Sequence, residues 1–498
     1  MKRRRINRRV FLGSAGVAAG GVLASSGGPA APADEQGPAP SPRTCRLPAR
    51  DIAEMAGYDL LVCGGGPSGI AAALAARRAG LRVLLVDSQG QLGGTGVSGL
   101  VSHWLGGRTG DCQRWVVGGV FRRMAREAEQ RGIALVPKPT DSKYQPHGWY
   151  GGHGGSLLAG IPFDPFGMAA YLDELVTSAG IDVLLGTQAI DAMVAARRIT
   201  HVILANKNGL TGVAAEVVVD ATGDADIAAR AGCPFAKGRE PDGLMTPASL
   251  TFHVDGVDQQ ALSEYIHAND APRFRKEIEQ LRAAGEWTFP YEIFISVQLD
   301  RPGTMMINTT RLVEIDGTDA ASCTQGLMRG RAEIQKLMRL MQQHFPGFSQ
   351  ARVKAVAPML GVRETRRIRG PYVLSVEDLN RGTDFADTIG FSAYGWDLPD
   401  PKRPSENPSH GPKRPVTPIP YRVMLPERVD NLICPGRAIS VERPVLGPLR
   451  VTAPCMAMGE AAGEAAALAI GRRLAMAAVD TQVLRTRLAE AGAIVDWT

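Results

Sequence analysis

The chain has 498 residues, 44% of them hydrophobic and 21% charged, a composition typical of a globular protein with two or three domains. Its net charge is +6, but six basic residues within the first nine positions supply the whole surplus. The 50 basic residues that remain balance the 50 acidic ones, which argues against nucleic acid as a partner. No run of about 20 apolar residues predicts a membrane span in the mature chain.

The first 33 residues have the order of an export signal. RRVFL at 8–12 resembles the twin-arginine motif that directs folded bacterial proteins across the inner membrane. A mildly apolar stretch rich in Gly and Ala follows, and APA at 31–33 fits a cleavage site. We therefore expect the twin-arginine export machinery as a partner and a periplasmic or secreted location. A basic tail and an uncleaved anchor are the alternatives. Residues 34–55 are rich in Pro and polar residues and predict a linker.

The segment 58–87 predicts a βαβ unit that binds a dinucleotide. An apolar run at 58–63 suits a strand buried on both faces, and the pattern G-x-G-x-x-G follows it directly. A helix is expected at 68–79, and a second strand at 82–86 ends on an acid. The residues expected at the nucleotide are Gly64, Gly66, Pro67, Ser68, Gly69 and Asp87.

Each part of this unit has a physical role. Gly64 allows the tight turn, Gly66 lets the backbone approach a pyrophosphate, and Gly69 lets helix and strand close up. The helix N-terminus offers free N–H groups to the phosphates. Asp87 is expected to accept the ribose hydroxyls and to repel a 2′-phosphate. The unit alone fits NAD and FAD equally.

Later segments favour a flavin. The Gly-rich loop at 92–96 follows the second strand, where a long extended ligand would pass. Asn208-Gly209 between apolar runs predicts a hairpin within 201–223. A strand at 431–434 leads into a Gly-Arg pair, and small residues in the helix expected at 453–470 would let that helix pack tightly.

Together these segments resemble the bacterial FAD-dependent oxidoreductase family, a glutathione-reductase-like group distantly related to the fumarate reductase flavoproteins. The resemblance covers most of residues 56–475. It is carried by GGGPSGIAAALAARRAG at 64–80, LGGTGVSGL at 92–100, FDPFGMAAYLDELVTSAG at 163–180, VVVDATGDADIAARAG at 217–232, GVRETRRIRGPYVLSVEDL at 361–379 and IPYRVMLPERVDNLICPGRAIS at 419–440.

The resemblance implies FAD as cofactor and an α/β fold. A Rossmann-like FAD-binding domain, with a parallel sheet, helices and a β-meander, would occupy 56–110, 163–240 and 426–498. A discontinuous α+β substrate domain would occupy 111–162 and 241–425. Beyond the βαβ unit, the implied FAD contacts are Gly93, Gly94, Thr95, Asp220, Ala221, Thr222, Gly223, Gly436 and Arg437. In flavoproteins of this build, the helix expected at 453–470 aims its N-terminus at the flavin.

Within the substrate domain, alternating runs between 241 and 315 predict antiparallel strands, and 319–344 predicts an amphipathic helix. The Pro-rich stretch 396–418 predicts a long loop that caps the site or is a mobile insertion.

Three groups are candidates for catalysis. His103 follows the Gly-rich loop and is a candidate general base, or a structural loop histidine. Arg363, with Arg366 on a helix or other arginines on a strand, is a candidate carboxylate clamp, or part of an ion-pair network with the adjacent Glu364. Tyr394 and Asp397 stand where relatives often carry Asp-x-His, although here Leu-Pro replaces the histidine position.

Metal and dithiol chemistry are not indicated. His147 and His153 have no carboxylate or thiolate cluster near them in sequence, so no metal site is expected. The seven cysteines form no CxxC pair. One disulfide is compatible with export but cannot be paired from sequence, and Cys63 and Cys434 are expected to be buried.

The predicted function is hydride transfer between a small organic substrate and FAD, as a dehydrogenase or reductase. No second G-x-G-x-x-G follows an expected strand. Electrons would therefore pass to or from the substrate and an external donor or acceptor. The alternatives are a flavin monooxygenase that uses NAD(P)H and oxygen, and a non-catalytic protein that holds FAD as an electron relay.

Overall fold

The computed structural model describes residues 45, 48–138, 160–240, 242–269, 273–406 and 415–497. Within them, seven strands form one sheet in the order β5-β2-β1-β8-β7-β6, with β17 also paired to β8. Their bounds are β1 Ala53–Cys63, β2 Val83–Val86, β5 Asp182–Leu184, β6 Gln188–Ala195, β7 Arg198–Asn206, β8 Gly209–Asp220 and β17 Leu432–Ile433. Strands β5, β2, β1, β8 and β17 run parallel, whereas β6, β7 and β8 form the predicted meander. The sequence predicted this α/β arrangement and a hairpin, whose two-residue turn is Lys207–Asn208 rather than the predicted Asn208-Gly209, because Gly209 already pairs with Asn206.

The part of strand β1 from Tyr58 to Cys63 is buried on both faces, as its apolar run predicted, whereas residues 53–57 are mostly exposed. Leu60 and Val62 contribute to one hydrophobic core, and Leu61 and Cys63 contribute to the core on the opposite face. Alternation with a period of two assigns successive side chains to opposite faces of the sheet. A parallel sheet covered on both faces has no room for polar side chains in its central strand.

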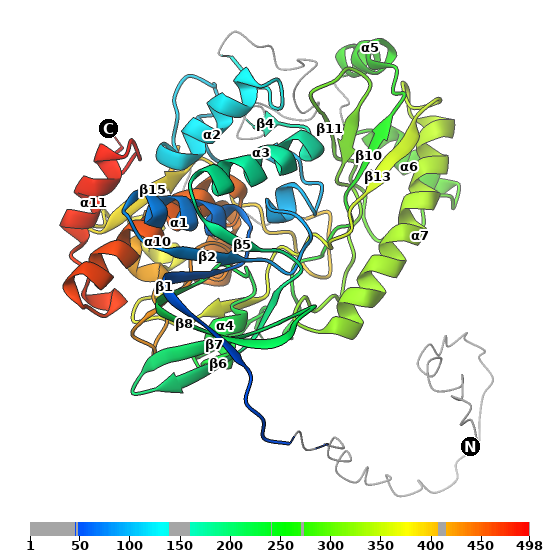
Figure 1. The fold of residues 1–498 in the computed structure, drawn as a ribbon. Coiled ribbons are helices and arrows are strands. Elements are labelled where there is room, and N and C mark those ends of the chain that lie inside the picture. Colours follow the sequence, from blue (N-terminus) through cyan, green and yellow to red (C-terminus); the bar gives the residue numbers. More distant parts are fainter. Residues whose placement is uncertain are drawn as a thin grey trace, which may run out of the picture. The chain divides into compact units, whose positions relative to one another are not determined.

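Two helices from distant parts of the sequence, α1 (Pro67–Arg78) and α10 (Thr452–Arg472), lie against each other over one face of the sheet (Figure 1). A Cβ at Gly459 would lie 2.0 Å from the Ser68 carbonyl oxygen, and one at Gly463 would lie 2.3 Å from that of Ala72. Glycines one turn apart therefore let the helix backbones touch, which is the close packing that the small residues of α10 predicted.

A second group of elements carries its own core. Strands β11 (Ser296–Gln298), β12 (Met305–Ile307), β10 (Phe252–Asp255) and β13 (Arg352–Val356) form an antiparallel sheet in that order. Helix α7 (Ala320–His344) runs beside it in Figure 1, with α5 (Gln259–Asn269) and α6 (Arg275–Ala283) near the same sheet. This core is rich in aromatic rings, with Phe274 stacked on Phe345 at 4.5 Å. The predicted antiparallel strands and the helix at 319–344 are confirmed.

The first core extends beyond the segments expected in the FAD-binding domain. Helix α2 (Gly119–Gln130) contributes Val120, Phe121 and Met124 to the core that α1 and α10 share. Residues between 374 and 425 enter the same core. The second core draws on residues from 248 to 360, with Leu100 added, so it is smaller than the substrate domain expected from sequence.

The remaining elements are two helices that pack on the first core, α3 and α11, and several short strands and helices. Their bounds are β3 His103–Trp104, β4 Ile161–Pro162, β9 Phe235–Lys237, β14 Arg366–Ile368, β15 Thr388–Ser392, β16 Thr417–Pro420, α3 Pro165–Ser178, α4 Asp226–Arg230, α8 Val376–Arg381, α9 Leu446–Leu449 and α11 Thr481–Glu490. None of the described helices is long and apolar enough to cross a bilayer.

Candidate active site

The loop between β1 and α1 is built on glycines that no other residue can replace. Gly64 has φ +111°, and a Cβ there would lie 2.3 Å from the Ala221 carbonyl oxygen. A Cβ at Gly69 would lie 1.8 Å from the carbonyl oxygen of Gly64. The first glycine therefore makes the turn against the end of β8, and the other lets α1 pack onto that turn.

The second glycine of the pattern, Gly66, faces open space. Apart from its chain neighbours, the nearest heavy atom of the described residues to a Cβ at Gly66 would be the Cα of Gly94, at 4.0 Å. Gly66 is also the N-cap of α1, where no side chain caps the helix and no acid stands in the first turn. Pro67 begins α1 and needs no N–H partner. Open space beside a helix N-terminus without acidic side chains fits the phosphates of a dinucleotide.

Asp87, directly after β2, is buried beside this loop. Its Oδ2 accepts from the Gly65 N–H at 2.5 Å, and its Oδ1 accepts from the Gln89 N–H at 2.6 Å. Burial raises its pKa, and the two backbone donors partly offset that effect. Each carboxylate oxygen has a second lone pair, so the residue can still accept a ribose hydroxyl, as predicted.

The Gly-rich loop after β2 folds back onto the turn. The Gly93 N–H donates to the Gly65 carbonyl at 2.9 Å, and Gly93 has φ +102°. Gly94 begins a short 3-10 helix, Gly94–Gly96, and Thr95 within it is exposed. This loop and the β1–α1 turn therefore form the two sides of one open cradle at Gly66.

The predicted contacts after β8 divide into two kinds. The Asp220 carboxylate is buried and accepts from Thr222 and from the Ala228 N–H, so it holds the start of α4. Burial raises its pKa to about 6. Ala221 and Gly223 instead supply backbone, the first to the turn at Gly64 and the second beside Arg437.

Gly436 and Arg437 join three distant segments at this cradle. A Cβ at Gly436, which has φ +101°, would lie 3.0 Å from Ser68 Oγ and 3.8 Å from Cys455 Sγ in the first turn of α10. Arg437 donates to Asp224 Oδ1 at 2.6 Å and to the Val362 carbonyl at 3.0 Å. The residues predicted to hold the nucleotide thus lie together at the carboxyl ends of the parallel strands, where α/β sheets bind ligands.

A model of the family described as FAD dependent oxidoreductase matches residues 59–488. The chain belongs to this family. FAD is its cofactor, and the open cradle at Gly66 and the acid at the end of β2 fit that group. The protein is therefore a FAD-dependent oxidoreductase.

Several solved structures are similar to this oxidoreductase at low sequence identity. A geranylgeranyl bacteriochlorophyll reductase-like protein from Thermoplasma acidophilum is 14% identical, with 88% of this chain and 92% of that chain covered and a TM-score of 0.43. A flavin-dependent brominase is 14% identical, with 88% and 83% covered and a TM-score of 0.45. A p-nitrophenol 4-monooxygenase from Pseudomonas putida is 11% identical, with 88% and 85% covered and a TM-score of 0.41. No curated protein matches.

Three of the four catalytic candidates come together in the oxidoreductase. Tyr394 donates to Asp397 Oδ2 at 2.5 Å, and Arg450 donates to the same oxygen at 3.1 Å. Burial raises the Asp397 pKa, but Arg450, Tyr394 and then Arg363 outweigh it and hold the pKa below its ordinary value. Burial and Asp397 raise the Tyr394 pKa well above its ordinary value. At neutral pH the pair is a charged carboxylate and a protonated phenol.

Arg363 lies outside any helix or strand, because β14 begins only at Arg366, and it acts on this pair through its charge. Its guanidinium donates to the Pro247 carbonyl at 2.6 Å and to Ser249 Oγ at 2.8 Å. Arg311 donates to the same hydroxyl at 3.2 Å. We call Arg311, Arg363 and Arg450 the arginine cluster. The sequence analysis missed Arg311 and Arg450. Arg311 follows the apolar run TMMINTT, and Arg450 stands two residues before α10, so their positions beside expected elements could have marked both as candidates.

The ion-pair network predicted around Glu364 also exists, but with other arginines. Glu364 is fully buried and accepts from Arg443 Nη2 at 2.7 Å and from Arg367 Nη1 at 3.4 Å. Glu364 and Arg363 are neighbours in sequence that face different surroundings. Arg363 is therefore available to the pair of Tyr394 and Asp397.

His103 has a different environment. It lies in β3, opposite Pro162 of β4, and is buried against Gly160. Burial lowers its pKa to about 4, although a backbone contact with Gly160 partly opposes this. The imidazole is neutral at pH 7 and is a weaker base than an ordinary histidine.

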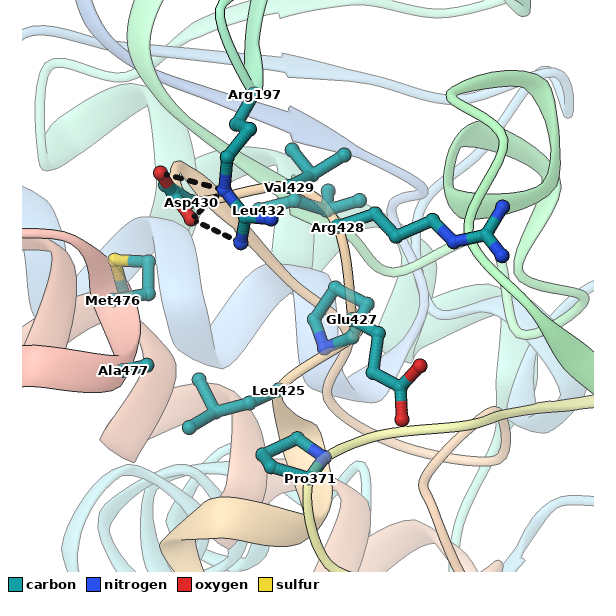
Figure 2. A pocket seen from close by; sticks show the side chains of 11 residues that line it. Arg197, Pro371, Leu425, Glu427, Arg428, Val429, Asp430, Leu432, Met476 and Ala477 are labelled. Carbon is teal, nitrogen blue, oxygen red and sulfur yellow. Dashed lines mark hydrogen bonds and ion pairs between the residues drawn. The ribbon is translucent and has the colours of Figure 1, made fainter.

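A separate surface cleft lies beside the segment that precedes β17. It is lined near the start of β17 by residues 425–430, together with Arg197 and Met476, and Figure 2 shows Arg197 paired with Asp430 across its rim. Arg197 Nη2 donates to Asp430 Oδ1 at 2.9 Å. Because FAD-binding loops follow the carboxyl ends of parallel strands, this cleft is not the nucleotide site.

The structure adds little to the metal and cysteine predictions. Among the described residues, no three His, Cys, Asp or Glu side chains gather as a metal site, and His147 and His153 lie outside those residues. The seven cysteines are free thiols, and Cys63 and Cys434 are buried, as predicted.

Proposed function

We propose that this oxidoreductase transfers a hydride between a small organic substrate and FAD, as a dehydrogenase or reductase. The supporting observation is the buried polar group formed by Tyr394, Asp397 and the arginine cluster, next to the start of α10. Gly447 of α9 packs against the backbone of Asp397, and Arg450 stands just before the N-cap Val451. The first turn of the same helix contacts Gly436 at the nucleotide cradle. The proposed substrate-binding residues and the residues at the cofactor cradle thus both lie at the N-terminus of α10.

FAD, when bound, supplies the group that accepts or delivers the hydride. The residues of this chain orient the substrate and move one proton. In the proposal, a substrate hydroxyl passes its proton to Tyr394 Oη while the phenol proton passes to Asp397 Oδ2, so that no charge is left on the tyrosine. His103, whose imidazole is kept neutral by burial, is a second proposed proton acceptor.

The test begins with the purified protein and its visible spectrum. We expect a yellow protein that releases FAD on denaturation and whose flavin is bleached without oxygen by some member of a set of organic substrates. A colourless protein, or one whose flavin no organic substrate reduces, contradicts the proposal. Rapid reduction by NADH or NADPH in a stopped-flow instrument would instead favour the monooxygenase alternative.

We also propose export by the twin-arginine route. The motif at 8–12 supports this proposal, and it lies outside the described residues. Replacing both Arg8 and Arg9 with Lys is expected to keep the folded flavoprotein in the cytoplasm. Cell fractionation measures the result, and an unchanged distribution contradicts it.

A further inference from the structure

The arginine cluster carries more positive charge than its surroundings neutralise. Arg311 is 4% exposed, Arg363 is 9% exposed, and the Arg450 side chain is 11% exposed. Among the described residues, Asp397 is the carboxylate that forms an ion pair with this cluster. Glu333 lies behind Tyr291, which donates to it at 3.2 Å. Three guanidinium groups thus share one carboxylate in a region with little water, which is costly unless an anion joins them.

The hydrogen bonds of the cluster are also incomplete. The Nε atoms of Arg311 and Arg450 are buried and have no partner within the described part of the chain. Most other donors of Arg311 and Arg363 meet neutral oxygens, such as Ser249 Oγ and the Pro247 carbonyl. Buried donors normally have partners, and a guanidinium fork matches the two oxygens of a carboxylate.

The site has open surface where a ligand would lie. The Asp397 side chain keeps 33% of its surface open, yet burial is the largest influence on its pKa. This open surface leaves the Asp397 carboxylate accessible beside the buried guanidinium groups. Burial also lowers the pKa of Arg311, and that of Arg363 well below its ordinary value, so both charges lack full compensation.

The arginine cluster is linked to the cofactor cradle by two routes. Arg450 lies two residues before α10, and Cys455 in the first turn of that helix faces Gly436. Arg437 of the cradle donates to the carbonyl of Val362, and the next residue is Arg363. We propose that the arginine cluster binds the carboxylate of an organic acid, which is the substrate of this oxidoreductase. This rests on the proposed function, because the bound acid is the molecule that exchanges the hydride.

The experiment uses the oxidised holoenzyme at constant ionic strength. It is titrated with acetate, succinate and benzoate, with the matched amides acetamide, succinamide and benzamide, and with inorganic phosphate. Flavin absorbance and the thermal unfolding midpoint are both followed. We expect at least one acid to perturb the flavin spectrum and raise the midpoint, while its amide and phosphate do neither. Equal responses to acid and amide, a response to phosphate alone, or no response to any acid overturns the proposal.

Variants assign the binding to the cluster. Arg311→Met removes a positive charge. Arg363→Lys keeps the charge but removes the paired N–H donors that bind both oxygens of a carboxylate. Each variant should raise the Kd of the responding acid about tenfold or more. Arg197→Met, which removes an exposed ion-paired arginine, is the matched control and should leave that Kd unchanged. Arg311→Met removes a buried side chain and can destabilise the protein. Arg363→Lys and the comparison of acids with amides on the wild type therefore test the proposal independently of that variant.

The two proposals fail in different ways. If the purified protein holds no flavin, the proposed hydride transfer fails, while the unfolding midpoint still reports whether acids bind. If Arg311→Met loses FAD and the wild type ignores all three acids, the cluster serves the cofactor and the carboxylate proposal is overturned.

Discussion

The nucleotide cradle and the arginine cluster are neighbours that are built in opposite ways. In the cradle, glycines at 64 and 69 bring backbone against backbone, and the buried acid at its edge accepts from two N–H groups. In the cluster, charged side chains are buried with donors left over. The first region is completed by the fold itself. The second is completed only by a ligand, so substitutions should affect folding in the first region and binding in the second.

The largest expected effect is that of Gly69→Ala. In a helix this change normally stabilises by about 0.5–1 kcal/mol, but here the new methyl would lie 1.8 Å from a carbonyl oxygen. We expect the variant to lose FAD and to fold poorly. The control is Gly471→Ala, at an exposed position in α10 with nothing within 4 Å, which should be neutral or stabilising. Soluble yield and flavin content are the measurements, and a yellow, stable Gly69→Ala protein would contradict the close packing of α1 on the turn at Gly64.

Next in size is Glu364→Gln, which removes a buried charge between the two regions. Arg443 and Arg367 would then face a neutral amide, and we expect a loss of about 3–5 kcal/mol in the free energy of unfolding. Glu377→Gln breaks an exposed pair with Arg381 and should cost no more than about 0.5 kcal/mol. Urea unfolding measures both. If the two variants lose the same free energy of unfolding, the buried ion pairs of Glu364 stabilise the protein no more than an exposed pair does.

A smaller effect is expected from acid. Burial lowers the pKa of His103 and of His253 to about 4, although backbone contacts partly oppose it. The unfolded chain therefore binds more protons between pH 6.5 and 4, so stability is full above this window and falls as the pH drops through it. At pH 5 the loss is about 2 kcal/mol for each imidazole. The free energy of unfolding, measured in urea, should fall between pH 7 and pH 5, and His253→Gln should reduce that fall by about 2 kcal/mol. If His253→Gln leaves the fall unchanged, His253 has no part in it.

The smallest effect on stability is expected from Tyr394→Phe. Loss of the hydrogen bond to Asp397 should cost about 1 kcal/mol and leave FAD bound. Its effect on the rate should be larger, because the proposed proton path is cut, and anaerobic flavin reduction should slow at least about tenfold. Tyr372→Phe removes a similar bond to Asp378, at 2.8 Å, and is the matched control for stability. If both variants reduce flavin at the wild-type rate, Tyr394 has no part in proton transfer.

The two regions also differ in how well the sequence predicted them. The centre of the cradle is local, because a strand, a glycine pattern and an acid lie within 30 residues, and the roles of Gly64 and Gly69 in the turn and the helix packing were foreseen. The cluster gathers single arginines at 311, 363 and 450 from three segments, and no spacing connects them. Arg363 and Asp397 were predicted one by one, but their shared environment depends on how the second core packs against the first. The reach of α2 into the first core was missed for the same reason.

The interlocked pair of α1 and α10 has a consequence for the order in which the protein is made. Gly459 and Gly463 of α10 pack against the backbone of α1. At the C-terminus of α1, Arg78 donates to Glu464 Oε1 of α10 at 2.8 Å. During synthesis on the ribosome, the first of these helices must wait for nearly the whole chain before its partner emerges. We therefore expect a polypeptide cut before α10 to capture no FAD, which would make cofactor loading a late check on chain completeness.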